Sequence, residues 1–142
     1  MKNFKFFTIT FAILMSIQFS MNAQGHVWLD GLARADGFTI VNGVEFQFQQ
    51  AKCNGADVVF LKVINNNNHA VELTWEDAVL NSDNTWVKSK SNNVKSIKLD
   101  ANQKIEGACE GKAQTLLLNL SDFSIKNNFK YFRASQLNIK QL

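Results

Sequence analysis

The strongest fold signal in this chain lies in residues 38–48, Phe38-Thr39-Ile40-Val41-Asn42-Gly43-Val44-Glu45-Phe46-Gln47-Phe48. Asn-Gly between two runs of β-forming residues is typical of a two-residue hairpin turn, because both residues tolerate the positive φ angles that such a turn needs. After the turn, apolar and polar side chains alternate, so that one face of the strand carries Val44, Phe46 and Phe48. The stretch therefore predicts an antiparallel hairpin with one buried face.

A second β signal follows in residues 58–76. Residues 58–64 are apolar on both faces apart from Lys62, as expected of an interior strand, and residues 69–76 alternate between apolar and polar. The four asparagines at 65–68 separate the two runs and predict a turn. Such a hairpin would pair Phe60 with Leu73 and would place Trp75 in the core.

The rest of the chain adds short β segments and no sustained helical period. These segments are residues 86–87, 94–99, 116–118 and 129–139. Val94 is out of phase with Ile97 and Leu99, which indicates a β-bulge. Together the patterns predict an all-β fold, a single-domain antiparallel β-sandwich, immunoglobulin-like or related, with seven to nine short strands.

Residues 1–23 have the pattern of a cleaved secretory signal peptide. Lys2 and Lys5 precede an apolar run over residues 6–19, and Ala23 is a small residue at the expected cleavage point. The run is shorter than a transmembrane helix requires. We therefore expect an exported protein, periplasmic or extracellular, with a β-sandwich domain over residues 24–142 and no transmembrane anchor in the mature chain.

The chain has two cysteines, Cys53 and Cys109, and both belong to the expected mature part. An isolated pair in an oxidising compartment favours a disulfide. A redox or metal pair is the alternative, but the sequence has neither C-x-x-C spacing nor a nearby His to support it. A disulfide here would stabilise the fold by about 4 kcal/mol on the loop-entropy model.

Cleavage after Ala23 would leave Gln24-Gly25-His26 at the new N-terminus. A free amine with His in third place can bind Cu(II) or Ni(II) through four nitrogens in a square plane. Cyclisation of Gln24 to pyroglutamate would remove the amine, and His26 is otherwise an ordinary strand residue. Metal binding through Gln24 and His26 is therefore the alternative function, and no other cofactor is predicted.

Motifs for catalysis are absent from the sequence, which has no P-loop, G-x-S-x-G elbow or H-E-x-x-H helix. Glu76 and Asp77 are adjacent carboxylates at a strand end, so a small hydrolase is a third alternative. Adjacent acids at a strand end are more often simply solvated. We therefore predict a non-catalytic protein.

Charge is distributed unevenly along the expected mature chain. Residues 24–84 carry three basic against eight acidic residues, a net of −5, and residues 85–142 carry ten against four, a net of +6. We expect these charges to pair across neighbouring strands; the alternative is a basic surface for an anionic polysaccharide.

A ligand surface is best sought near Trp86, which follows a turn-like polar run and is the tryptophan most expected to be exposed. The candidate ligand-binding residues are Trp86, Lys88, Lys90 and Lys95. The leading hypothesis is a secreted or periplasmic, non-catalytic binding or envelope-associated module for a protein or glycan ligand. A nucleic-acid partner is not expected.

Overall fold

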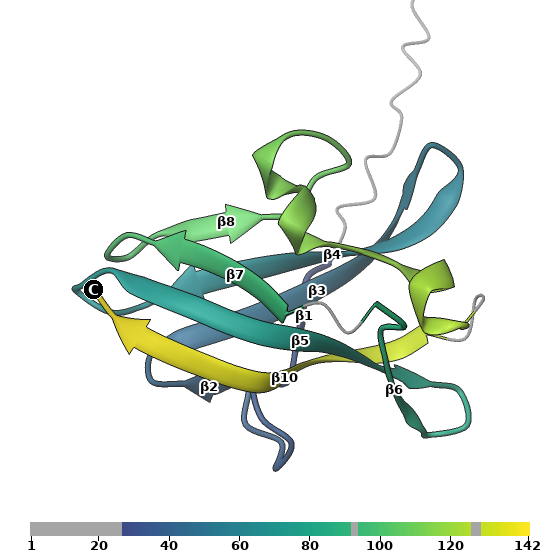
Figure 1. Ribbon diagram of the computed structural model, residues 1–142, viewed down its shortest axis with the longest axis horizontal. Coiled ribbons are helices and arrows are strands. Elements are labelled where there is room, and N and C mark those ends of the chain that lie inside the picture. The colour runs from purple at the N-terminus through teal and green to yellow at the C-terminus, as the bar shows by residue number, and fades with distance from the viewer. Residues whose placement is uncertain (1–26, 92–93, 126–128) are drawn as a thin grey trace, which may run out of the picture.

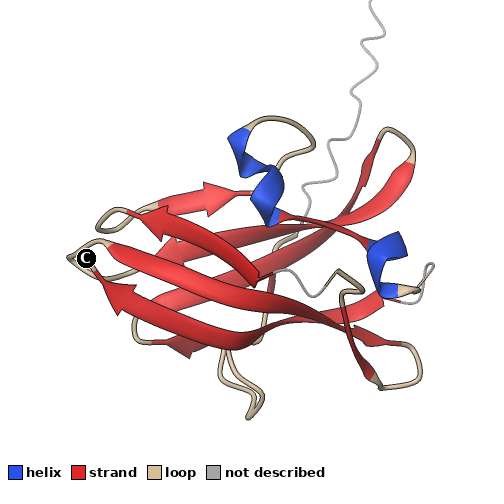
Figure 2. Ribbon diagram, in the orientation of Figure 1, coloured by secondary structure: helices blue, strands red, loops and turns tan. Residues whose placement is uncertain are grey.

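The computed structural model describes residues 27–91, 94–125 and 129–142. This part of the chain forms two antiparallel sheets packed face to face, with two short 3₁₀ helices, η1 (Lys112–Leu116) and η2 (Leu120–Phe123), beside them (Figures 1 and 2). The strands are β1 (Leu29–Asp30), β2 (Ile40–Val41), β3 (Val44–Cys53), β4 (Ala56–Asn65), β5 (Val71–Asn81), β6 (Trp86–Lys88), β7 (Val94–Leu99), β8 (Lys104–Glu106), β9 (Leu117–Asn119) and β10 (Phe129–Gln141). The predicted all-β sandwich is confirmed. The described residues hold more strands than the predicted seven to nine because several strands are only two or three residues long.

The core lies between the two sheets. The first sheet has the order β1-β3-β4-β8, with β2 also paired to β3 and β9 to β4. The second sheet has the order β10-β5-β6, with β7 also paired to β5. Phe46 of the first sheet meets Trp75 of the second edge-to-face, with ring centroids 5.4 Å apart, and both side chains are fully buried. The predicted core position of Trp75 is confirmed.

The Asn-Gly hairpin is also confirmed. Asn42 and Gly43 have φ angles of 45° and 72°, and they join β2 to β3 with Val41 opposite Val44. Asn54 and Gly55 repeat this geometry, with φ angles of 51° and 82°, between β3 and β4. The same Asn-Gly signal therefore marks a second hairpin turn in this chain.

The predicted pairing of residues 58–64 with residues 69–76 is wrong. β4 pairs along its whole length with β3, from Cys53 opposite Ala56 to Val44 opposite Asn65. β5 lies in the other sheet, between β10 on one side and β6 and β7 on the other. The loop at residues 66–70 therefore carries the chain from one sheet to the other, and the apolar faces of β4 and β5 meet across the core instead of lying side by side.

Asn65 is the residue that organises this crossing. It is 0% exposed, and its Nδ2 donates to the carbonyl oxygens of His69 at 2.9 Å and of Asp100 at 2.8 Å. Its Oδ1 accepts from the backbone N–H of Asn67 at 3.1 Å and from Nδ2 of Asn67 at 2.9 Å. Nδ2 of Asn67 in turn donates to the carbonyl of Asn42. A side chain at Gly43 would collide with this amide of Asn67. The side chain of Asn65 thus satisfies backbone groups of His69, Asp100 and Asn67, which lie outside the strands.

The bulge predicted at Val94 is also wrong. β7 pairs with β5 without a register shift, from Val71 opposite Leu99 to Glu76 opposite Val94. Val94 is exposed, so the inward positions of β7 are Lys95, Ile97 and Leu99. Lys95 takes an inward position in this regular strand, where Asp77 of β5 is its acidic partner.

The predicted disulfide between Cys53 and Cys109 is confirmed, with Cα atoms 5.6 Å apart. It ties the last residue of β3 to the loop that follows β8. Within the described residues, no helix is long and apolar enough to cross a membrane.

Candidate functional site

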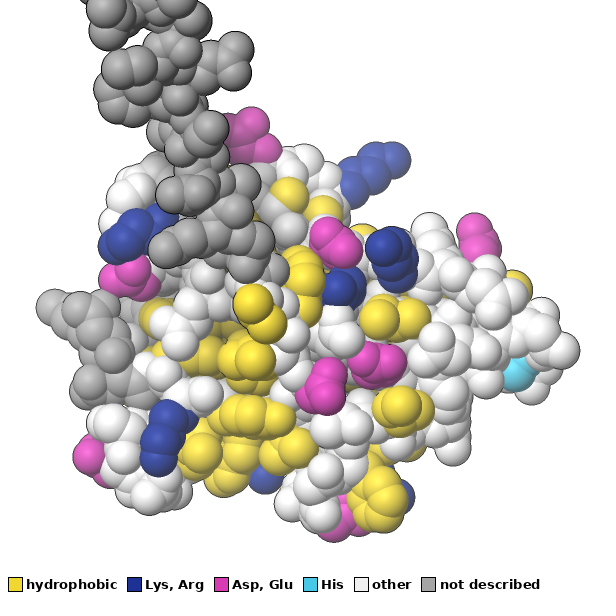
Figure 3. All heavy atoms as spheres, turned by 180° about the vertical axis from the view of Figure 1, so that it is seen from behind, with side chains coloured by type: hydrophobic (Ala, Val, Ile, Leu, Met, Phe, Trp, Pro, Cys, Tyr) yellow, Lys and Arg dark blue, Asp and Glu magenta, His cyan; other side chains and the backbone are white. Residues whose placement is uncertain are grey.

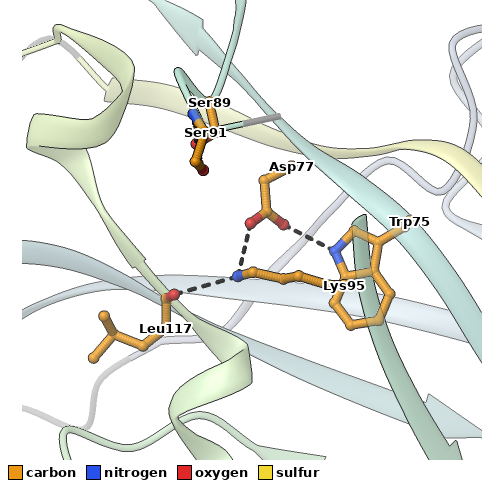
Figure 4. A network of polar contacts seen from close by, with 6 residues as sticks. All are labelled: Trp75, Asp77, Ser89, Ser91, Lys95 and Leu117. Atoms are coloured by element: carbon orange, nitrogen blue, oxygen red, sulfur yellow. Dashed lines mark hydrogen bonds and ion pairs between the residues drawn. The ribbon is translucent and has the colours of Figure 1, made fainter. Parts of the chain in front are cut away.

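A buried polar network lies on the inner side of the second sheet (Figure 4). Asp77 projects from β5 in phase with Trp75, and Lys95 projects from the neighbouring β7 opposite Trp75. Nζ of Lys95 lies 2.7 Å from Oδ2 of Asp77, and the indole Nε1–H of Trp75 donates to Oδ1 at 2.8 Å. Nζ also donates to the carbonyl of Leu117 in β9 at 3.3 Å, so this cluster connects the two sheets.

Burial dominates the electrostatics of this cluster. Loss of contact with water raises the pKa of the Asp77 carboxyl above its usual range, although the charge of Lys95 and the hydrogen bonds from Lys95 and Trp75 act in the opposite direction. A small cavity of about 120 Å³ adjoins the pair and is also lined by Ser89, Ser91 and Asp122. The site therefore combines a carboxyl that resists ionisation, an amine and room for a few water molecules.

The two carboxylates considered for a hydrolase do not converge. Glu76 and Asp77 are consecutive residues of β5, so their side chains point to opposite faces of the sheet. Glu76 lies on the outer face, where Oε2 is 2.7 Å from Nζ of Lys88. Each carboxylate has its own lysine, and the sheet separates the two pairs.

The predicted pairing of charges across neighbouring strands is confirmed. Lys88 of β6 contacts Glu76 of β5, and Lys98 of β7 lies opposite Glu72 of β5, with 3.9 Å between Nζ and Oε1. On the face of the molecule seen in Figure 3, lysines and arginines are scattered among acidic side chains. The excess of positive charge in the second half of the sequence is thus opposed by the acids of β5.

The four candidate ligand-binding residues occupy different environments. Lys95 is half-buried against Asp77, Lys88 is paired with Glu76, and Lys90 is exposed in the segment after β6. Trp86 is half-buried, and the guanidinium of Arg133 lies over its indole ring at 4.2 Å from the centroid. The structure therefore does not gather these four side chains into one surface.

Sequence reasoning missed Arg133 as the partner of Trp86. β10 and β6 flank β5, and Arg133 of β10 and Lys88 of β6 both lie opposite Ala78 of β5. This register brings the side chain of Arg133 within reach of Trp86 in β6. Its Nε is buried and has no hydrogen-bond partner among the residues that the structure describes. No local pattern could have revealed this contact, because it depends on the register of two strands on a third.

A groove of about 580 Å³ lies at the hairpin of β3 and β4, and we call it the hairpin groove. Its main lining residues are Gln49, Gln50, Lys52, Asp57, Val58 and Phe60. Phe60 is half-buried and presents apolar surface beside the buried Val58. Lys52 and Asp57 form an exposed ion pair, with 2.8 Å between Nζ and Oδ1. The groove thus combines an apolar side with a polar rim.

Gln49 is the unusual member of this groove. It is only 9% exposed, and its side-chain amide makes no hydrogen bond to any residue within 27–91, 94–125 and 129–142. Gln49 lies opposite Phe60 in the pairing of β3 with β4, so the amide and the aromatic ring stand beside each other. The amide carries both a donor and an acceptor, so a ligand in the groove can form hydrogen bonds with it in both directions.

Two sequence-based expectations lie outside the described residues. These are the signal peptide at residues 1–23 and the metal-binding N-terminus formed by Gln24 and His26. Among the residues that the structure describes, no cluster of three or more His, Cys, Asp or Glu side chains could hold a metal ion.

Comparison with known proteins adds no further assignment. No protein-family model, curated protein or solved structure matches this chain. The function of this chain is therefore inferred from the geometry of its own residues.

Proposed function

We propose that this chain is an exported, non-catalytic β-sandwich module, periplasmic or extracellular, that binds a glycan in the hairpin groove. The signal-like residues 1–23 support export, and so does the disulfide between Cys53 and Cys109, because disulfides persist in oxidising compartments. The described strands bring no pair of carboxylates or nucleophile with a base together in the groove, which supports binding over catalysis.

The observation that carries the ligand class is the pairing of Gln49 with Phe60. A sugar ring offers an apolar face of C–H groups and a rim of hydroxyls, which suits an aromatic ring beside an amide. Lys52 and Asp57 add a donor and an acceptor at the edge of the same groove. The volume of about 580 Å³ falls within the range of small-ligand sites and accommodates one or two sugar rings.

The test is binding of the exported protein to an array of immobilised oligosaccharides, followed by calorimetric titration with the best-bound one. Gln49→Leu keeps the size and burial of the side chain but removes the amide. We expect it to weaken binding roughly tenfold, the effect of losing about one good hydrogen bond. Phe60→Leu should weaken binding as well.

Trp86→Ala is the matched control, because Trp86 lies outside the groove. It should leave the affinity unchanged, with folding of all variants checked by circular dichroism. Absence of any glycan binding, or equal affinity in Gln49→Leu and the parent protein, would contradict the proposal. Loss of binding in Trp86→Ala alone would place the ligand on the surface around Arg133 instead.

A further inference from the structure

The contact between Asp77 and Lys95 brings together the two functional groups of an amide bond. Nζ of Lys95 lies 2.7 Å from Oδ2 of Asp77, and their side chains are only 17% and 7% exposed. The two residues come from neighbouring strands of one sheet. We propose that the pair condenses spontaneously to an amide between Nζ of Lys95 and Cγ of Asp77, which joins β5 and β7 covalently in the mature protein.

The reaction is a condensation in which one C–N bond forms and one C–O bond breaks. A proton passes from the ammonium Nζ to Oδ2, which leaves a neutral amine beside a neutral carboxylic acid. The nitrogen attacks Cγ, the Cγ–Oδ2 bond breaks, and Oδ2 takes a second proton from Nζ and leaves as water. The products are one amide and one water, so neither an oxidant nor an activated donor is required.

The surroundings favour each part of this reaction. Burial raises the pKa of Asp77, which increases the share of the protonated acid that can react. The N–H of Trp75 holds Oδ1 at 2.8 Å, where it would stabilise the negative charge that develops on this oxygen during attack. The two groups are also held in contact, and well-oriented intramolecular reactions reach effective concentrations of about 10⁵–10⁸ M.

The site also suits the product. The single N–H of the amide would donate to the carbonyl of Leu117, which already lies 3.3 Å from Nζ, and Oδ1 would keep its bond from Trp75. Both polar groups of the cross-link would therefore be satisfied without any new partner. A neutral amide also removes two charges from a buried position where they are costly to desolvate. The adjoining cavity of about 120 Å³ gives room for the departing water.

The test is the intact mass of the exported protein with its disulfide in place. We expect a mass lower by one water, about 18 Da, than that of the disulfide-bonded mature chain. Trypsin should fail to cleave after Lys95, and the digest should contain residues 63–88 joined to residues 91–98. Cyclisation of Gln24 removes ammonia, about 17 Da, and is distinguished by fragmentation of the N-terminal peptide.

Lys95→Arg is the matched control. Its guanidinium can still pair with Asp77, but it stays protonated and forms no amide, so this variant should have its full mass. Parent protein of full mass after several days of incubation would overturn the proposal. A loss of water that persists in Lys95→Arg would also overturn it, because it would mark a cyclic imide elsewhere in the chain. The mass measurement is independent of glycan binding, so this proposal and the proposed function can fail separately.

Discussion

Replacement of Asn65 by alanine should destabilise the protein more than any other single asparagine change. The side chain donates to two backbone carbonyls and accepts from the backbone and the side chain of Asn67, and it is completely buried. Four hydrogen bonds at about 1 kcal/mol net each give about 4 kcal/mol. Water can reach part of this loop because Asn66 beside it is exposed, so we expect a loss of about 3 kcal/mol.

The measurement is equilibrium unfolding in urea, with the free energy of unfolding taken by linear extrapolation and the m-value used to verify that the exposed surface is unchanged. Asn66→Ala is the matched control. Its exposed side chain makes no hydrogen bond to any residue that the structure describes, so its effect should stay within about 0.5 kcal/mol. A loss below about 1 kcal/mol for Asn65→Ala would refute the view that this side chain holds the crossing between the sheets.

Three further predictions concern the disulfide, a titrating tyrosine and the basic segment. Replacing Cys53 and Cys109 together by alanine should lower the free energy of unfolding by about 4 kcal/mol while the β-type circular dichroism persists, and native thiols found by titration would contradict the bond. Burial, and then the charge of Asp30, raise the pKa of Tyr131 above 10.0. The free energy of unfolding therefore falls as the pH rises from about 10 through the folded-state pKa of Tyr131. Tyr131→Phe should lose less of this free energy than the parent above about pH 10 in urea titrations, and equal losses would contradict the raised pKa. Because acids of β5 pair with Lys88, Lys95 and Lys98, heparin should not bind with submillimolar affinity at about 0.15 M salt. Submillimolar binding in a calorimetric titration would contradict this expectation.

Local sequence rules predicted the elements of this fold but not their neighbours. Alternation of apolar and polar residues marks the buried face of β5, and Asn-Gly marks a tight turn, because both depend on the geometry of a few consecutive residues. Alternation does not say which strand lies alongside. β4 and β5 each had the pattern of a hairpin partner, yet the hydrogen bonds of Asn65 to His69 and Asp100 direct them into different sheets.

The same distinction applies to the candidate sites. Asp77 is in phase with Leu73 and Trp75, so its inward position is readable from the sequence. The expected strand end at Glu76 and Asp77 is wrong, because β5 continues to Asn81, and Asp77 is buried instead of solvated. Its partner Lys95 was not readable, because the pairing of β7 with β5 brings them together. Gln49 and Phe60 likewise meet only in the register of β3 with β4.

The sequence by itself determined that this is an all-β chain with an export-like beginning, tight Asn-Gly turns and one pair of cysteines available for a disulfide. These features depend on backbone preferences and composition, which act over short stretches of chain or over the chain as a whole. Only the tertiary structure decided which charges are neutralised, which acid is buried and where a groove opens. Those properties depend on residues far apart in the sequence, and strand register, sheet choice and solvent exclusion are settled only when the two sheets pack.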